Sequence, residues 1–280
     1  MYLERDGVRL FYTTLGSGPD VVMMHPTPTH HGFWMPVARL LADRYRLILV
    51  DLRGHGQSRV IAGPISAPIT MRQLAEDVHA VLQSLQITRA AFVGCSIGSY
   101  VLYEYWRRFP QEMCAMVLAC GKPQPDTDAN RERRREWMAS ARQPGGLASF
   151  FDLMADTLVG PTAQREQPSV RAAAREMMSS MTLDAMLAVQ QGLALRPDSL
   201  PTLPTIQIPV CVIAGGEDQS STPLEMRQAA ENISGAEFHE VFNSGHYAPL
   251  EQTKELAALI DNFFQRNFAP DSMQNSRETH

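Results

Sequence analysis

The chain has 280 residues, of which 44% are hydrophobic and 20% are charged, and its formal net charge at pH 7 is −5. This composition is typical of a globular protein, and the length suits one large domain or a core domain with an insertion. The negative charge argues against nucleic acid or an anionic membrane surface as partners. No apolar run approaches the ~20 residues that span a bilayer, and the N-terminus lacks the apolar core of a signal peptide, so we expect a cytoplasmic location.

Strand and helix signals alternate in the first half of the chain. Loose alternation of apolar and polar residues is typical of a hairpin strand, and short apolar runs that end in a polar residue are typical of buried parallel strands. The expected elements are strands at residues 8–15, 20–25, 46–51, 90–93 and 115–120, and helices at residues 70–85 and 100–109. This alternation predicts a parallel sheet covered on both faces.

The pattern changes after Gly121, where helical signals alone continue until a stiff, proline-rich linker leads back to alternation. The expected elements are helices at residues 131–141, 147–158, 170–181 and 183–195, the linker at residues 196–204, strands at residues 209–214 and 237–242, and helices from Pro223 and over residues 250–268. We therefore expect an α/β core at residues 1–121 and 205–268 and a four-helix insertion at residues 122–204. The polar tail at residues 269–280 is expected to be disordered.

The four cysteines, Cys95, Cys114, Cys120 and Cys211, lie in or beside apolar runs. Their spacing is not that of a zinc site, so we expect buried, reduced thiols.

The densest basic segment is residues 131–136, where acidic residues interrupt the arginines at helical spacing. This pattern favours a solvated helix face, and an anion-binding site is the alternative.

The segment Gly94-Cys95-Ser96-Ile97-Gly98 carries the strongest chemical signal. A serine flanked by glycines two residues away on each side, between a strand and a helix, is the nucleophile-elbow pattern. The turn is so tight that side chains at the flanking positions would collide with the neighbouring strand and helix. The pattern predicts Ser96 as a nucleophile above the carboxyl edge of the sheet, beside a helix N-terminus that favours negative charge.

A serine nucleophile needs a general base that a carboxylate orients, and in hydrolases of this architecture the chain order is Ser, Asp or Glu, then His. Asp218 and His246 each follow a predicted strand downstream of Ser96, so both are expected at the same edge of the sheet. Glu217 is the alternative carboxylate, and Asp218 could instead cap the following helix. The alternative for His246 is a histidine of a surface loop.

An oxyanion hole needs two backbone N–H donors. The residue after the nucleophile, Ile97, is expected to supply one donor, and the loop after an early strand the other. In the Pro26-Thr27-Pro28 triplet of that loop only Thr27 has an N–H, so Thr27 is the predicted second donor. The alternative for this loop is a rigid connector.

In these motifs the chain resembles the α/β-hydrolase superfamily, and within it the esterase and 3-oxoadipate enol-lactonase-like group. The matching segments are residues 25–28, Phe33-Trp34, residues 51–58, residues 94–98, residues 215–218 and Gly245-His246. The resemblance implies a mostly parallel, doubly wound sheet with an inserted four-helix cap, and it makes residues 51–58 a structural turn near the site. Pro26 stands where the group usually has glycine, and Ser99 stands where a second glycine often follows Gly98.

The sequence also offers candidates for the substrate pocket. Candidate lining residues are His30, Trp34, Trp137, Phe151 and Met154, and the many methionines suggest an adaptable apolar pocket. The alternatives are that the apolar residues of the insertion form its own core and that His30 and His31 are exposed or structural.

The sequence therefore predicts a serine hydrolase that cleaves esters or lactones of small, largely apolar acids through an acyl-enzyme, with no metal and no organic cofactor. A cofactor-free perhydrolase or haloperoxidase and a C–C bond hydrolase would use the same triad. A ligand receptor on a hydrolase scaffold, with little turnover, is the alternative from another class.

Overall fold

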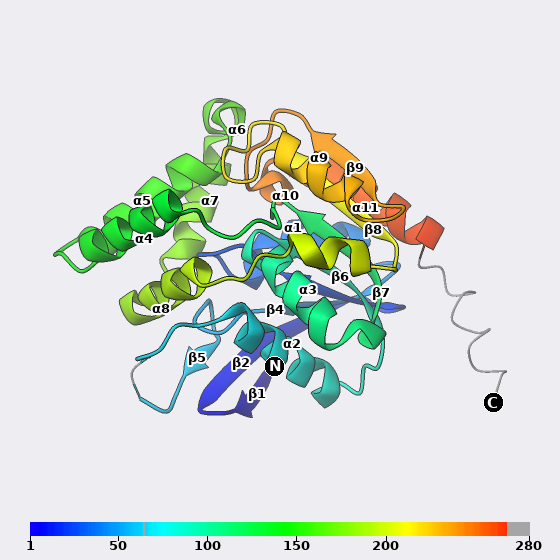
Figure 1. Cartoon of the computed structure of the whole chain (residues 1–280), viewed down its shortest axis with the longest axis horizontal. Coiled ribbons are helices and arrows are strands. Elements are labelled where there is room, and N and C mark those ends of the chain that lie inside the picture. The colour runs from blue at the N-terminus through cyan, green and yellow to red at the C-terminus, as the bar shows by residue number, and fades with distance from the viewer. Residues whose placement is uncertain (64, 268–280) are drawn as a thin grey trace.

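The computed structural model describes residues 1–63 and 65–267. Within them one sheet has the strand order β1-β2-β4-β3-β6-β7-β8-β9, and β5 pairs with β2 (Figure 1). The strands are β1 (Tyr2–Arg5), β2 (Val8–Leu15), β3 (Asp20–Met24), β4 (Arg46–Val50), β5 (Arg59–Val60), β6 (Ala90–Cys95), β7 (Met113–Ala119), β8 (Val210–Gly215) and β9 (Glu237–Val241). β2 pairs antiparallel with β1, β4 and β5. The neighbouring strands in the order β4-β3-β6-β7-β8-β9 all pair parallel, so the predicted mostly parallel sheet is confirmed.

Burial explains why the central strands are continuous apolar runs. Every residue of β6, β7 and β8 is buried, because helices cover both faces of a parallel sheet. The helices of this core are α1 (Met35–Leu41), α2 (Met71–Ser84), α3 (Ile97–Arg108), α9 (Pro223–Glu231), α10 (Ala248–Glu251) and α11 (Thr253–Asn267). The helix predicted over residues 250–268 is therefore divided at Gln252, whose φ of −128° and ψ of 51° are not helical.

The connections place a switch point beside β3. The chain moves from β3 to β4 in one direction across the sheet, whereas β6, β7, β8 and β9 follow one another in the opposite direction. Because such crossovers are right-handed, α1 and α3 are expected on opposite faces of the sheet. Ligands of open α/β sheets bind where the direction reverses, beyond the carboxyl ends of the strands. Here that crevice lies beyond β3 and β6.

The segment between β7 and β8 holds five α-helices, one more than predicted. They are α4 (Asp128–Ala141), α5 (Gly146–Leu158), α6 (Pro161–Glu166), α7 (Pro168–Met178) and α8 (Leu183–Ala194). The additional helix, α6, begins with a proline at its first position, and its six residues are too few to show a helical period in the sequence. In Figure 1 these helices, in green to yellow-green, lie together on one side of the sheet.

The division of the chain into a core and an insertion, with the boundaries given above, stays a prediction. The tail at residues 269–280 lies outside the described residues. Of the helices that the structure describes, none is both long enough and apolar enough to cross a membrane.

Candidate active site

Ser96 lies in the sharp turn between β6 and α3. Its φ of 53° and ψ of −115° are strained for a residue with a side chain. A Cβ atom on Gly94 would lie 2.5 Å from the carbonyl carbon of Gly98, and one on Gly98 would lie 2.5 Å from the carbonyl oxygen of Met24. Both contacts involve backbone, which cannot move aside, so the two glycines that the motif requires have a steric cause.

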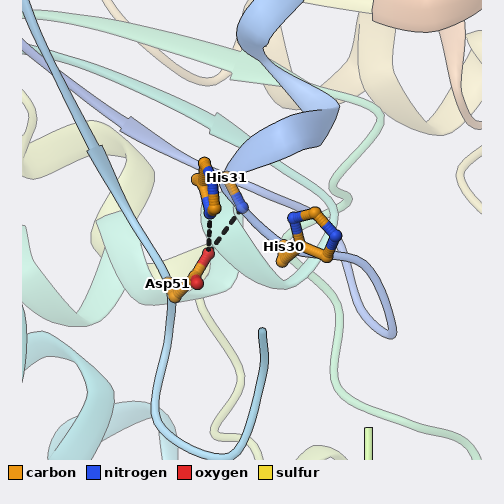
Figure 2. A group of neighbouring side chains, drawn as sticks. All are labelled: His30, His31 and Asp51. Atoms are coloured by element: carbon orange, nitrogen blue, oxygen red, sulfur yellow. Dashed lines mark hydrogen bonds and ion pairs between the residues drawn. The ribbon is translucent and has the colours of Figure 1, made fainter. Parts of the chain in front are cut away.

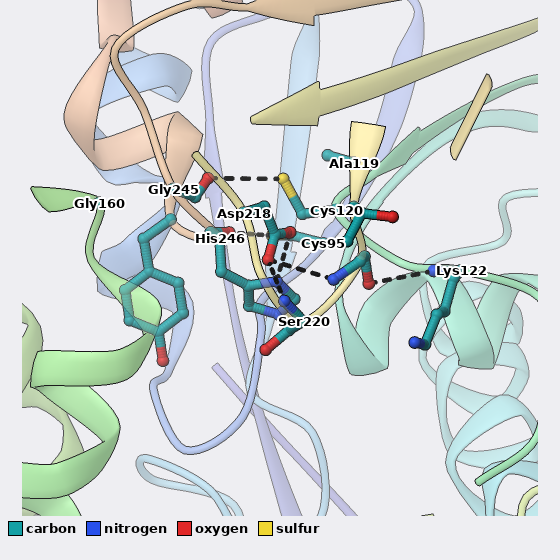
Figure 3. A network of polar contacts seen from close by, with 12 residues as sticks. Cys95, Ala119, Cys120, Lys122, Gly160, Asp218, Ser220, Gly245 and His246 are labelled. Atoms are coloured by element: carbon teal, nitrogen blue, oxygen red, sulfur yellow. Dashed lines mark hydrogen bonds and ion pairs between the residues drawn. The ribbon is translucent and has the colours of Figure 1, made fainter. Parts of the chain in front are cut away.

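His246 and Asp218 form a buried pair beside this turn. His246 Nδ1 and Asp218 Oδ2 are 2.7 Å apart, and the two residues are 4% and 2% exposed. The second oxygen, Asp218 Oδ1, accepts hydrogen bonds from the backbone N–H groups of Ser220 at 2.7 Å and Ser221 at 3.1 Å (Figure 3). Both oxygens are therefore held, and the bond to Nδ1 leaves Nε2 of His246 as the nitrogen that can accept a proton.

The neighbouring carboxylate is bound elsewhere. Glu217 accepts hydrogen bonds from the N–H of Thr162, at 3.0 Å, and from its hydroxyl, at 2.5 Å. These contacts turn Glu217 toward α6 and away from His246. Thr222 caps α9, so Asp218 does not serve that role.

Ser96, His246 and Thr27 all line one cavity of about 290 Å³. This places the three elements of the predicted chemistry around a single space, at the crevice beyond β3 and β6. The sequence order of the motifs predicted this meeting of segments more than 200 residues apart.

In the part of the chain that the structure describes, the N–H of Thr27, which lines this cavity, and the N–H of Ile97, the residue after Ser96, have no hydrogen-bond partner. Ile97 is fully buried, and a buried N–H without a partner is rare. The Thr27 hydroxyl donates to Nε2 of His55 at 2.9 Å, and its carbonyl accepts from the hydroxyl of Tyr247 at 3.2 Å. The side chain and the carbonyl of Thr27 are thus both anchored while its N–H stays available.

The histidines beneath the Thr27 loop are buried and neutral. His25 Nδ1 donates to the carbonyl of Pro26 at 2.9 Å, and its Nε2 accepts from the N–H of Leu52 at 3.0 Å. Burial lowers the pKa of His25 to about 3 and the pKa of His55 to about 4. These histidines are therefore structural acceptors and donors at neutral pH.

Glu251 was missed by the sequence reasoning. This buried carboxylate accepts backbone N–H groups from Gly245 at 2.8 Å, Gly160 at 2.9 Å and Tyr247 at 3.1 Å. Two of these donors flank His246, and the third, Gly160, lies between α5 and α6. A glutamate five residues after His246, in a mostly apolar segment, is the signal that could have found it. Burial raises the pKa of Glu251 to about 7.

Replacing Glu251 with glutamine is expected to lower the free energy of unfolding by about 1–3 kcal/mol, because the amide N–H₂ of glutamine cannot accept from the backbone donors. Urea denaturation at constant pH measures this change. Glu255→Gln, on the exposed face of α11, is the matched control and is expected to change it by about 0.5 kcal/mol or less. Equal effects of the two substitutions would show that the three N–H contacts contribute nothing.

Two sulfur atoms complete the support of the His246 loop. The thiol of Cys95 contacts the carbonyl of His246 at 3.8 Å, and the thiol of Cys120 contacts the carbonyl of Gly245 at 4.0 Å (Figure 3). All four cysteines are buried and free, as the sequence predicted. Burial raises the pKa of the Cys95 thiol, which leaves it a poor nucleophile despite its place beside Ser96.

The predicted pocket residues divide into two groups. Trp137 and Met154 line the cavity, whereas His30, Trp34 and Phe151 do not. Trp34 is fully buried, and its indole N–H donates to the carbonyl of Met24 at 2.9 Å. Phe151 is buried against Phe150 and His30 lies near Asp51, so the interpretation of these three as pocket residues was wrong.

The lining of the cavity is mixed, whereas the sequence suggested an apolar pocket. One methionine, Met154, lines the cavity together with Trp137, Leu158 and Leu193, and many of the other lining side chains are polar. The charged and amide side chains that the sequence reasoning missed include Lys122, Asp126, Asn130, Arg134, Gln190 and Arg196. Arg134 belongs to the basic segment that was expected to be solvated, and helical spacing alone cannot tell which of its arginines turns inward.

His30, His31 and Asp51 form the one group of side chains in the described residues with a spacing that could suit a metal ion (Figure 2). Asp51 Oδ1 is 2.6 Å from the backbone N of His31 and 2.9 Å from its Nδ1, and Oδ2 accepts the N–H of Gln57 at 2.8 Å. His30 Nδ1 accepts the N–H of Gly32 at 3.0 Å. These hydrogen bonds tie the loop at residues 30–32 to the turn at residues 51–58, so the group is explained as structural support for that turn.

The chain matches the alpha/beta hydrolase family over residues 21–259. It belongs to this family, which confirms the resemblance seen in its motifs and the predicted fold class.

Similar proteins include carboxylic ester hydrolases. The 3-oxoadipate enol-lactonase 2 of Acinetobacter baylyi is 26% identical over 268 residues, which cover 94% of this chain and 96% of that protein. The pimeloyl-acyl-carrier-protein methyl ester esterase of Xanthomonas axonopodis pv. citri is 28% identical and covers 89% of this chain and 96% of its own length. Among solved structures, a thermophilic esterase from Thermogutta terrifontis has a TM-score of 0.88 at 28% identity, covering 94% of this chain and 95% of that one.

Proposed function

We propose that this protein is a serine hydrolase of carboxylic esters or lactones, in which Ser96 is the nucleophile, His246 the general base and Asp218 the residue that orients it. The observation that carries the proposal is the buried His246–Asp218 pair, 2.7 Å apart, on the same cavity as the strained Ser96. The relatives that are esterases and enol-lactonases support the reaction class.

The proposed reaction has two halves. Ser96 Oγ attacks the ester carbonyl carbon as Nε2 of His246 takes the hydroxyl proton, and the N–H groups of Thr27 and Ile97 stabilise the oxyanion. The intermediate collapses, the C–O bond to the alcohol breaks, and the imidazolium returns its proton to the leaving oxygen. Water, deprotonated by His246, then attacks the carbonyl carbon of the acyl-enzyme. The bond from that carbon to Ser96 Oγ breaks, the imidazolium returns its proton to Ser96 Oγ, and the acid is released. In a lactone the acid and the alcohol leave as one molecule.

In this proposal residues 122–204 act as a cap over the cavity, since α4, α5 and α8 supply Trp137, Met154 and Gln190 to its wall. No metal or organic cofactor takes part in any step, and the partner is a small-molecule ester or lactone.

Replacing Ser96 with alanine is expected to lower the rate of 4-nitrophenyl acetate hydrolysis by roughly 10⁴- to 10⁶-fold, because no other group forms the acyl-enzyme. Steady-state release of 4-nitrophenol measures the rate, and Ser149→Ala in α5 is the control with an unchanged rate. Wild-type turnover in the Ser96→Ala variant would contradict the proposal. A single burst that leaves the wild-type protein modified, without turnover, would support the receptor instead.

A further inference from the structure

We propose that the cavity contains a carboxylate-binding subsite formed by Arg134 and Arg196, so that the substrate is an ester or lactone that also carries a carboxylate. The inference rests on the proposed function for the reacting end of the substrate. The sequence predicted a substrate derived from a small, largely apolar acid, whereas this subsite requires a substrate with a negative charge.

The charged side chains around Asp126 are not balanced in number. Arg134 Nε donates to Asp126 Oδ2 at 2.5 Å, and a terminal nitrogen of Arg196 donates to Asp126 Oδ1 at 2.5 Å. The three side chains are 15%, 4% and 2% exposed. Burial acts against the charged form of Asp126, yet the hydrogen bonds and charges of the two arginines hold the pKa of its carboxyl below the usual value. A buried guanidinium group, that of Arg196, and a half-buried one, that of Arg134, thus share one carboxylate, which leaves one positive charge without a counter-ion.

The other partners of the two arginines are neutral. Arg134 donates to the side-chain oxygen of Gln190 at 2.6 Å, and Arg196 donates to the carbonyl oxygen of Gln124 at 3.0 Å. Nε of Arg196 is buried and has no hydrogen-bond partner among the described residues. A buried charge that is neither paired nor fully hydrogen-bonded is costly. A monoanion would supply both the missing charge and an acceptor, and a carboxylate fits the planar fork of a guanidinium.

The remaining cations of the cavity agree with this assignment. Lys122 pairs with Glu225 at 2.8 Å and therefore adds no net charge. Arg133 is exposed at the cavity, and within the described ranges it has no ion-pair partner, so it adds positive potential at the rim.

The subsite lies close to the reacting serine. The guanidinium carbon of Arg196 is 4.6 Å from the centre of the Tyr100 ring. Tyr100 lies one helical turn after Ser96 in α3, and its N–H donates to the Ser96 carbonyl at 3.2 Å. All three residues line the same cavity. A carboxylate held by the arginines would thus be a few bonds from the reacting carbonyl, as in a half-ester of a short dicarboxylic acid or an ester of a carboxylate-bearing alcohol.

Matched pairs of esters test the subsite. For the acyl side, mono-4-nitrophenyl glutarate is compared with its methyl ester; for the alcohol side, 4-acetoxybenzoate is compared with methyl 4-acetoxybenzoate. We expect kcat/KM to favour the charged ester in one of the two pairs by about 10- to 100-fold, the range of charge-assisted hydrogen bonds. No preference, or a preference for the neutral ester, in both pairs would overturn the proposal.

Variants on one helix then locate the effect. Arg134→Gln is expected to reduce the preference for the charged ester at least tenfold, and Arg133→Gln, at an exposed position where folding is not at risk, by about two- to fivefold. Arg135→Gln is the matched control, because Arg135 is exposed on α4 and pairs with Glu132 outside the cavity. An equal loss in the Arg135→Gln variant would assign the preference to the general charge of the helix and contradict the subsite.

Binding of glutarate, measured by calorimetry, separates this proposal from the hydrolase proposal. The wild type and Ser96→Ala are expected to bind glutarate equally, and Arg134→Gln at least tenfold more weakly. Binding that survives in Arg134→Gln would overturn the subsite even if esters are hydrolysed. Binding with this pattern, in a protein that hydrolyses no ester, would retain the subsite and reject the reaction.

Discussion

Replacing Asp218 with asparagine is expected to lower kcat for ester hydrolysis by about 10⁴-fold in a protein that remains folded. Asparagine keeps the shape of the side chain, but its amide no longer stabilises the imidazolium and favours the wrong tautomer of His246. In the structure Asp218 Oδ2 is 2.7 Å from His246 Nδ1, and both groups are buried, so water cannot replace the carboxylate.

Glu217→Gln is the control next to this position. Glu217 hydrogen-bonds to Thr162 rather than to His246, so its substitution is expected to change kcat less than tenfold. Both variants are assayed with 4-nitrophenyl acetate, and circular dichroism checks the fold. A larger loss in Glu217→Gln than in Asp218→Asn would reverse the assignment of the two carboxylates.

Acid pH is expected to destabilise the protein through His25 and His55, whose pKa values burial lowers from 6.5 to about 3 and about 4. Below pH 6.5 the unfolded chain binds protons that the folded chain does not, so the stabilisation present above pH 6.5 is lost as the pH falls. Each histidine contributes about 1.4 kcal/mol per pH unit, and the pair about 4 kcal/mol between pH 7 and pH 5. This is a large part of the 5–15 kcal/mol that stabilises a typical domain.

Glu251 acts with the opposite sign, because its pKa is raised to about 7 and the stability it contributes falls as the pH rises from 4.5 to 7. The test is therefore a comparison of variants by urea denaturation at pH 6 and pH 5. His55→Asn is expected to reduce the slope of the unfolding free energy by about 1.4 kcal/mol per pH unit. Thr27→Val removes the hydroxyl that His55 accepts but no titrating group, so it is expected to keep the wild-type slope. Equal slopes in wild type and His55→Asn would refute the buried neutral histidine.

The strands and the elbow were predictable because their causes are local. Gly94 and Gly98 lie within four residues of each other, and a continuous apolar run such as that of β6 is itself the sequence signal of a buried strand. The short helix α6 was not predictable from periodicity, since its six residues complete less than two turns. The helix predicted over residues 250–268 was divided for a similarly local reason, at one residue with non-helical backbone angles.

The partners of charged side chains could not be predicted in the same way. Glu217 and Asp218 are neighbours after one strand, yet Glu217 binds Thr162 of α6 and Asp218 binds His246. Trp34 is a large aromatic residue of the kind that often lines a pocket, but it is buried and its indole N–H donates to the backbone carbonyl of Met24. Each outcome depends on a residue of another segment of the fold, which periodicity within one element cannot reveal.

Local spacing and the order of motifs along the chain suffice for the α/β fold, the elbow at Ser96 and the edge of the sheet where Asp218 and His246 were expected to meet. The character of the cavity does not follow from them. Arg134 and Arg196 are 62 residues apart in the sequence. Only the folded structure brings both of them to Asp126, and only there does the excess of positive charge in the cavity become visible. The net charge around a cavity depends on which side chains surround it, and these side chains come from segments that only the tertiary structure brings together.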